Sequence, residues 1–381
     1  MPTAARRYIL YHCIITPLLF VWYIVPYLML ITGISVFEAG LIFTLSSLIS
    51  SCMNFIVGKW LDKGNPNLLM CIISIIEGSA YLLYFVGFKI KNILWIISAS
   101  TLEKLSYGFY PAYVIYEYEA YPEHIREKVY VYHNVLPLIS QAITYPVIGY
   151  IIGILSPTYQ TLLSSLLIIA FLSYISALLP LYWLPRVRST RIVENRASYK
   201  GFVPKGFYPI ALTLLLVGFS YQITPSIVLV NLFIKVLGGG LFAISVYEAI
   251  SGITTVLFSI PLLKVKKEKG KLMVILGLLF MCISNLMLAL GRRIEFAFLS
   301  SFLFSAGYAI MDPFFMDILF SKIPSDKKGT ILGGLAGIRR IMGIITPTLS
   351  GYLAQYIAPN SPYLTSAFAL FISILLILFF S

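Results

Sequence analysis

Residues 8–31 read YILYHCIITPLLFVWYIVPYLMLI, an uninterrupted stretch without Asp, Glu, Lys or Arg. A helix needs about 20 mostly apolar residues to cross the hydrocarbon of a bilayer. Arg6 and Arg7 precede the stretch, as basic residues do in a signal peptide. The apolar run is too long for a signal peptide, however, and no small-residue cleavage site follows it. We therefore predict an uncleaved first membrane span.

The rest of the chain has the same apolar character. Hydrophobic residues make up 59% of the 381 positions, charged residues make up 11%, and the mean hydropathy is +0.90. A soluble domain carries about 25% charged residues, because water must wet its surface. The composition thus excludes an ordinary soluble domain and predicts an all-α membrane protein with many spans.

Further apolar windows of span length follow at short intervals along the chain. Together with the first they give twelve predicted spans: 8–31, 36–57, 68–88, 92–116, 130–155, 160–184, 207–234, 240–263, 272–291, 295–321, 330–357 and 362–380. The long connection at 185–206 is polar and basic. We predict an N-terminal six-helix bundle at 1–184, a cytoplasmic linker at 185–206 and a C-terminal six-helix bundle at 207–381.

Lysine and arginine lie mostly on one side of the predicted spans. Twenty of the 28 fall on the side of the N-terminus and five fall on the other side. Cytoplasmic loops of membrane proteins carry such an excess. We therefore expect both termini in the cytoplasm and the chain in the plasma membrane. The net charge of +13 is explained by topology, and no nucleic-acid partner is expected.

Cysteine usage and nucleotide motifs give no sign of a cofactor. The cysteines are scattered in apolar stretches, without a CxxC pair or a neighbouring histidine cluster: Cys13, Cys52, Cys71 and Cys282. This pattern predicts neither a disulfide framework nor a metal site. The chain has no GxxxxGK[ST] loop, so we do not expect ATP to drive it. A monomer without a cofactor is predicted.

An internal repeat relates the two halves of the chain. A constant shift, 313 − 111 = 202 positions, matches Pro111 with Pro313, Pro122 with Pro324, Arg126 with Lys328, and Gly149-Tyr150 with Gly351-Tyr352. Together with the arrangement of six spans, linker and six spans, these matches indicate two homologous bundles. Parallel halves of this kind are one plan of membrane transporters, with the substrate bound at the midplane.

The connection between the second and third spans carries a family signature. Residues 58–64 read GKWLDKG. This segment resembles the Gly-x-x-x-Asp-(Arg/Lys)-x-Gly loop of the major facilitator superfamily: Gly58, Asp62 and Lys63 match, but the second glycine comes one position early. The resemblance implies a twelve-helix transporter of two pseudo-symmetric six-helix bundles. It also implies that this loop, and Asp62 in particular, latches one conformation of the bundles.

Ionisable residues inside spans are candidates for function, because placing one charged side chain at the middle of the bilayer costs about 2.5–3.5 kcal/mol of insertion free energy. The predicted spans contain Glu77, Glu103, Lys104, Glu248, Asp312, Asp317, Arg339 and Arg340. At about 100° per residue, Glu103, Tyr107 and Tyr110 share one face of the fourth span. Tyr308 and Asp312 share a face of the tenth span. The resemblance implies that the fourth and tenth spans line a central cavity, so the candidate substrate residues are Tyr107, Tyr110, Tyr308, Asp312 and Arg339.

Two of these acidic residues are candidates for coupling transport to protons. Removal from water favours the protonated form of a carboxyl group. Glu103 and Asp312 lie on the faces assigned to the cavity and are therefore the candidate proton carriers. Lys104 is a candidate charge partner of Glu103, and Arg339 is a candidate partner of Asp312.

We predict a secondary active transporter that moves a small organic solute through the lipid bilayer by alternating access, with protons as a candidate coupling ion. An aromatic, mildly acidic cavity suits a cationic or polyhydroxylated solute, whereas Arg339 suits a carboxylate. A lipid scramblase or flippase is the alternative. A membrane-embedded lipid-modifying enzyme is a weaker one, because Asp312 and Asp317 point to different faces of their helix. Enzymatic activity is not expected.

Overall fold

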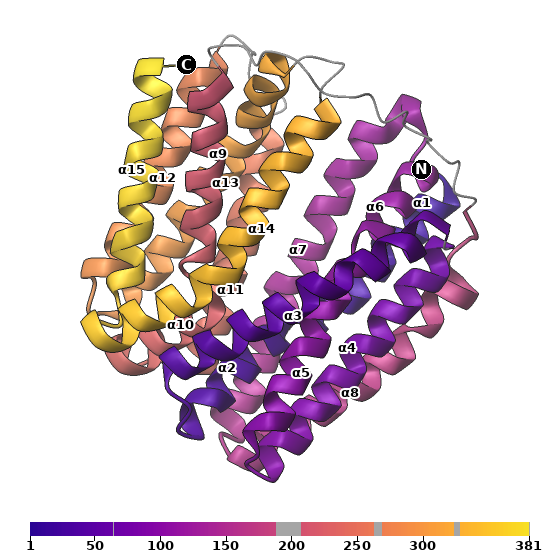
Figure 1. Cartoon of the computed structure of the whole chain (residues 1–381), viewed down its shortest axis with the longest axis vertical. Coiled ribbons are helices and arrows are strands. Elements are labelled where there is room, and N and C mark those ends of the chain that lie inside the picture. Colours follow the sequence, from indigo (N-terminus) through magenta and orange to yellow (C-terminus); the bar gives the residue numbers. More distant parts are fainter. Residues whose placement is uncertain (64, 188–206, 263–268, 324–327, 381) are drawn as a thin grey trace. The chain divides into compact units, whose positions relative to one another are not determined.

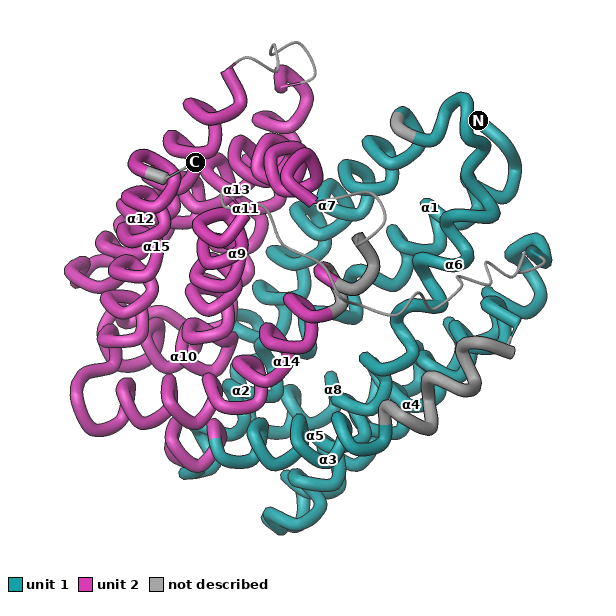
Figure 2. Tube along the Cα trace, turned by 45° about the horizontal axis from the view of Figure 1, so that its top comes forward, with its two compact units in different colours: residues 1–34, 41–194 teal, residues 35–40, 195–381 magenta. Residues whose placement is uncertain are grey.

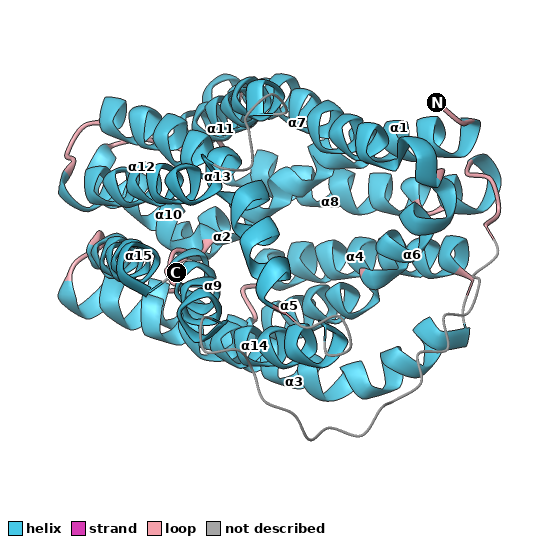
Figure 3. Cartoon of the chain, turned by 90° about the horizontal axis from the view of Figure 1, so that it is seen from above, coloured by secondary structure: helices cyan, strands magenta, loops and turns pink. Residues whose placement is uncertain are grey.

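The computed structural model of the protein describes residues 1–63, 65–187, 207–262, 269–323 and 328–380 (Figure 1). Within these ranges, the side chains of residues 54–63, 127, 328–330, 332–333 and 380 are not described. The described elements are helices joined by loops, and no strand occurs among them (Figure 3). The predicted all-α class is confirmed.

The chain forms two compact units, which Figure 2 colours separately. Unit 1 consists of Met1–Ile34 and Leu41–Glu194, and unit 2 consists of Ser35–Gly40 and Asn195–Ser381. The predicted linker at 185–206 lies largely outside the described residues, so its extent stays a prediction.

In unit 1 several spans are built from more than one helical piece. The elements, in chain order, are α1 (Thr3–Ile15), η1 (Thr16–Phe20), α2 (Val21–Ile31), α3 (Val36–Lys63, whose first residues up to Gly40 belong to unit 2), α4 (Pro66–Lys89), α5 (Ile93–Ser106), η2 (Tyr107–Phe109), α6 (Pro111–Ala120), η3 (Glu123–Ile125), α7 (Arg126–Tyr150), η4 (Ile151–Leu155), α8 (Tyr159–Ser176) and η5 (Leu179–Trp183). Helix α4 packs against α5 and α8. A buried core that includes Tyr8, Ile73 and Tyr116 joins α1, α4 and α6.

Unit 2 repeats this plan with longer continuous helices. Its elements are α9 (Phe207–Gln222), α10 (Ser226–Leu232), η6 (Phe233–Leu237), α11 (Leu241–Leu262), α12 (Gly270–Leu290), α13 (Ile294–Lys322), α14 (Lys328–Tyr352), η9 (Leu353–Ile357) and α15 (Ser361–Phe380). Helix α12 packs against α13 and α15, as α4 packs against α5 and α8 in unit 1. Between α9 and α10 the chain bends by 51°. Pro225, which lacks a backbone N–H, lies at this bend.

The internal repeat found in the sequence recurs in the helix bounds. Helix α7 begins at Arg126 and ends at Tyr150, and α14 begins and ends at the equivalent positions, Lys328 and Tyr352. Each helix continues into a π-helical segment, η4 or η9, and the bounds of these two segments are equivalent as well. The two halves therefore share local geometry as well as the order of their helices.

Nine helices of the described part are long and apolar enough to cross a membrane, and the bent pair of α9 and α10 makes a tenth. The two other predicted spans, 92–116 and 330–357, are also helical. The first is divided by η2, which leaves α5 only 14 residues long. The second, α14, carries Arg339 and Arg340 in its interior.

One predicted loop differs from the structure. Residues 58–63, expected between two spans, form the last turns of α3, which ends at Lys63. The first proline after the start of α3 is Pro66, in the sequence Gly64-Asn65-Pro66. No proline therefore interrupts the helix before Lys63. The side chains of Gly58, Asp62 and Lys63 are among those not described, and their latch role therefore stays a prediction.

A close approach of backbones holds α12 against α13. A Cβ atom on Gly277 would lie 2.5 Å from the carbonyl oxygen of Gly307, and a Cβ on Gly307 would lie 2.5 Å from that of Gly277. Small residues allow such contacts between membrane helices, where dispersion forces drive association.

We expect Gly277→Ala to destabilise unit 2 by about 1–3 kcal/mol, the usual cost of overpacking a tight interface. The measurement is the thermal unfolding midpoint of the purified protein in detergent. Gly337→Ala is the matched control, because nothing lies within 4 Å of a Cβ at Gly337. A Gly277→Ala midpoint as high as that of the control would contradict the close contact.

Candidate functional site

Two glutamates from neighbouring helices of unit 1 form a hydrogen-bonded group that we call the carboxyl cluster. It consists of Glu77, Tyr84, Glu103, Ser106, Tyr107 and Tyr110. Glu77 and Tyr84 belong to α4, Glu103 and Ser106 to α5, Tyr107 to η2, and Tyr110 to the turn before α6. The packing of α4 against α5 brings these side chains together.

Tyrosine hydroxyls donate to both oxygens of Glu103. The hydroxyl of Tyr84 lies 3.0 Å from Oε2, and that of Tyr107 lies 3.0 Å from Oε1. Glu103 is only 7% exposed and Tyr84 is fully buried. A buried polar group without hydrogen bonds is costly, so these two bonds are what allow the carboxyl group to be enclosed.

Glu77 receives its hydrogen bonds on a single oxygen. The hydroxyl of Tyr110 donates to Oε1 at 2.7 Å, and Ser106 Oγ lies 3.1 Å from the same atom. Ser106 Oγ also lies 2.8 Å from the backbone carbonyl oxygen of Glu103, so this hydroxyl connects the surroundings of the two acids. In the described part of the chain, neither Glu77 nor Glu103 forms an ion pair with a cation.

The break in the fourth span places the two donors. Residues 107–109 form a 3-10 turn, and Pro111 then begins α6. A proline lacks the N–H that would continue the hydrogen-bond ladder of α5, so the helix restarts there. The rings of Tyr107 and Tyr110 lie with centroids 5.0 Å apart. The hydroxyl of Tyr107 donates to Glu103 and that of Tyr110 donates to Glu77, so residues at this turn supply hydrogen bonds to both acids.

Lys104 contacts aromatic rings. Its Nζ lies 4.8 Å from the ring centroid of Tyr107 and 5.6 Å from that of Phe43. A cation over an aromatic face is attracted by the ring quadrupole. The expected ion pair with Glu103 is not among the ion pairs of the described residues.

A small cavity adjoins Glu77. Its volume is about 20 Å³, and it is lined by Ile15, Leu18, Leu19, Ser74, Glu77, Tyr81, Tyr113, Ser173 and Ser176. About 10–15 Å³ of such volume is enough for one water molecule, provided that polar partners surround it. Three serines and the carboxyl group supply those partners, so the cavity beside Glu77 has room for one water molecule.

In unit 2 the predicted residues gather around Asp312 on α13. The ring of Tyr221, from α9, lies 5.8 Å from that of Tyr308 in an edge-to-face arrangement. Arg339, from α14, is close enough for electrostatic attraction to Asp312, although the ion pairs found in the described residues do not include this one. The described positions thus bring Tyr308, Asp312 and Arg339 into one region of unit 2.

Two residues of α9, Gly218 and Gln222, contact Arg339. A Cβ on Gly218 would lie 2.9 Å from Arg339 Nε, so the arginine side chain runs over this glycine. The side-chain amide of Gln222 donates to the backbone carbonyl oxygen of Arg339 at 3.1 Å. These contacts fix α14 against α9 and leave Arg339 itself exposed.

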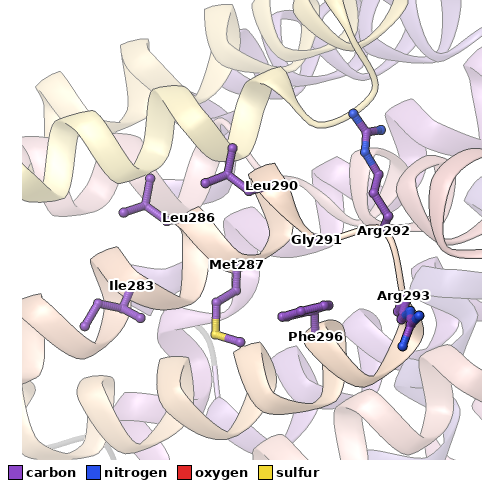
Figure 4. Close-up of a pocket in the computed structure, with 8 residues that line it drawn as sticks. All are labelled: Ile283, Leu286, Met287, Leu290, Gly291, Arg292, Arg293 and Phe296. Atoms are coloured by element: carbon purple, nitrogen blue, oxygen red, sulfur yellow. The ribbon is translucent and has the colours of Figure 1, made fainter.

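A larger cavity of about 440 Å³ lies in unit 2, where α12 ends and α13 begins (Figure 4). Its lining consists of Ile283, Leu286, Met287, Leu290, Gly291, Arg292, Arg293 and Phe296. None of the sequence-predicted site residues belongs to it.

Sequence reasoning named Glu77 as an ionisable residue but did not assign it to the site. The helix-face argument compares residues of one span, and Glu77 comes from another helix. The available signal was that Glu77 is the one acidic residue in the sequence of α4, a helix that is otherwise mostly apolar.

Comparison with known proteins supplies the family context. The profile of the Major Facilitator Superfamily matches residues 8–347. Comparison with curated protein sequences gave no match. The fold is similar to that of the nucleoside transporter NupG, with a TM-score of 0.72, 12% identity and 100% of each chain covered. It is also similar to a bacterial homologue of the iron transporter ferroportin in an inward-facing state, with a TM-score of 0.76, 13% identity and 99% of each chain covered. At such identities, the likeness establishes the fold alone.

The carboxyl cluster predicts a coupling between Tyr110 and Glu77. We expect Tyr110→Phe to lower stability by about 1–3 kcal/mol, because the half-buried carboxyl group of Glu77 loses its shortest hydrogen bond. In a Glu77→Gln background the same change should cost less, since a neutral amide oxygen is a weaker acceptor. Thermal unfolding of the four proteins measures the difference. Tyr182→Phe, at a side chain that is 83% exposed, is the control; equal losses in both backgrounds would contradict the coupling.

Proposed function

The chain belongs to the Major Facilitator Superfamily, and from this premise we propose that it is a proton-coupled secondary transporter that moves a small organic solute by alternating access. Membership and the transporter folds it resembles support a multi-pass membrane transporter. Proton coupling and the class of solute are our own inferences, and they rest on the residues described above.

Proton coupling is proposed because neither glutamate of the carboxyl cluster has a cation partner among the described residues. Glu103 is enclosed, and its carboxyl oxygens accept hydrogen bonds from two tyrosines. Hydrogen bonds stabilise a carboxylate that is kept from water, and its charge is neutralised either by a cation or by protonation. Since no described cation pairs with Glu77 or Glu103, a proton is the neutralising species available to the carboxyl cluster. Loss and gain of that proton would accompany the change of access.

The solute is proposed to contact the residues around Asp312. This region offers a negative group, a positive group and the edge-to-face rings of Tyr221 and Tyr308. Asp312 can accept a hydrogen bond from one group of a solute, and Arg339 can donate a hydrogen bond to another. The two rings can pack against the apolar part of the same solute. A small organic solute with several hydrogen-bonding groups fits this chemistry. A nucleoside is one solute of this kind, and NupG, which the chain resembles in fold, is a nucleoside transporter.

The location proposed is the plasma membrane, with both termini in the cytoplasm. The excess of lysine and arginine on the side of the N-terminus supports this orientation.

Uptake into liposomes tests the coupling. A thermal-shift screen of nucleosides, amino acids, short peptides, sugars and organic amines first identifies a ligand, and its labelled form is then followed under an imposed pH gradient. Glu103→Gln should abolish gradient-driven accumulation and leave counterflow exchange within about twofold of wild type, because the amide cannot carry a proton.

Glu295→Gln is the matched control for that experiment, because Glu295 is an exposed carboxylate at the start of α13. It should leave both activities intact. Gradient-driven uptake by Glu103→Gln at the wild-type rate would exclude the coupling role. Lipid scrambling by the same liposomes without solute uptake would favour a lipid scramblase instead.

Labelling of single cysteines tests the orientation. In a variant without the four native cysteines, His124→Cys lies on the predicted cytoplasmic side and Arg293→Cys lies on the opposite side, and both positions are exposed. A membrane-impermeant maleimide added to intact cells should label Arg293→Cys and should label His124→Cys only after lysis. The reverse pattern would place the termini outside.

A further inference from the structure

Two histidines and a glutamate meet in unit 1, outside the carboxyl cluster. His12 comes from α1, Glu117 from α6 and His133 from α7. One nitrogen of each imidazole and one carboxylate oxygen lie within 4.8 Å of one another. His133 Nδ1 lies 3.6 Å from Glu117 Oε1, and these two side chains are only 14% and 12% exposed. The group is therefore both compact and largely enclosed.

Aromatic contacts hold the two imidazoles in place. The ring of Tyr8 packs edge-on against His12 at 4.6 Å and against His133 at 5.4 Å between centroids. The centroids of the two histidines are 4.7 Å apart. The hydroxyl of Tyr8 donates to Glu117 Oε1 at 2.9 Å, which fixes the carboxylate. A partner that orients a carboxylate in this way is typical of the second layer around metal ligands.

The imidazoles have buried nitrogens without hydrogen-bond partners. Neither His12 Nε2 nor His133 Nδ1 has one, although both atoms are out of contact with solvent. An unsatisfied buried polar atom costs about 1–3 kcal/mol, and one explanation for such an atom in a native protein is a bound ion. Two such nitrogens beside one carboxylate are the independent sign that this group receives a ligand.

We propose that His12, Glu117 and His133 bind a divalent transition-metal ion, such as Zn²⁺ or Co²⁺. Because the three ligand atoms lie within 4.8 Å of one another, a point exists that is at most about 2.8 Å from each of them. Side-chain shifts of less than about 1 Å would bring the three atoms to the 2.0–2.2 Å distance of zinc ligands. Two imidazoles and one carboxylate suit zinc and its neighbours. Mg²⁺ and Ca²⁺ prefer oxygen ligands throughout, and Cu⁺ prefers sulfur. Three protein ligands leave a position for water or another small ligand.

This site goes beyond the proposed transport of an organic solute, and it uses none of the residues assigned to proton coupling. No metal site was expected from the sequence, because its cysteines and histidines are not clustered. His12 lies in the first predicted span and Glu117 lies at the end of the fourth, so only the fold brings them together. Metal ligation would tie α1 to α6 and α7.

Metal binding to the purified full chain tests the proposal, with the protein carrying no polyhistidine tag. Zn²⁺ should raise the thermal unfolding midpoint of wild type, because a ligand that binds only the folded state stabilises it. Co²⁺ should give the visible absorption of a site with nitrogen and oxygen ligands. His12→Ala and Glu117→Gln should each weaken binding by at least about tenfold. The chain offers a matched control, His124→Ala, at an exposed histidine that should bind as wild type does.

Several results would overturn the site. An unfolding transition in EDTA shows that the wild type is folded. If this folded protein gains neither stability from Zn²⁺ nor a visible spectrum from Co²⁺, the site does not exist. Loss of binding in His124→Ala equal to that in His12→Ala would assign the metal to surface histidines. Glu117→Gln keeps the size of the side chain, so it provides the comparison if His12→Ala does not fold.

Discussion

The burial of Glu103 and the partial burial of Glu77 among packed helices are the constraint on which the carboxyl cluster depends. A carboxyl group inside an apolar bundle must find hydrogen bonds or be excluded from it. Helix α4 supplies Tyr84, and the turn at residues 107–109 supplies Tyr107 and positions Tyr110. That turn exists because Pro111 cannot continue the ladder of α5. A single local break in the fourth span thus places one tyrosine donor for each of the two acids.

The two halves use the same plan for different chemistry. Helices α7 and α14 have equivalent bounds under the internal repeat, and α4 and α12 make equivalent contacts. The position equivalent to Glu103, however, is Ser305, whose hydroxyl bonds to Ser251 at 2.7 Å. Unit 2 carries its acid two turns later, at Asp312, where Arg339 is near. The repeat preserves helix geometry, whereas the charged groups are specific to each half.

Much of the fold could be predicted from the sequence because apolar runs and basic loops reflect the bilayer directly. The first span, the order of the helices and the internal repeat all follow from such patterns. The end of α3 was predicted too early, since residues 58–63 include Lys59, Asp62 and Lys63 and are still helical. Contacts between spans could not be predicted. Lys104 of α5 lies over the ring of Phe43 on α3, and no periodicity within one span records a contact of this kind. The same holds for the meeting of Glu77 with Tyr110, and of His12 with His133.

The proposal that the carboxyl cluster carries a proton is tested most directly by infrared spectroscopy, which needs no knowledge of the solute. A protonated carboxylic acid has a carbonyl stretching band that a carboxylate lacks. We expect this band in the purified wild type at neutral pH, its decrease as the pH is raised, and its loss in the Glu77→Gln, Glu103→Gln double variant. Spectra of wild type and double variant that show no difference in this band would mean that both glutamates are ionised, and would exclude proton binding by the carboxyl cluster.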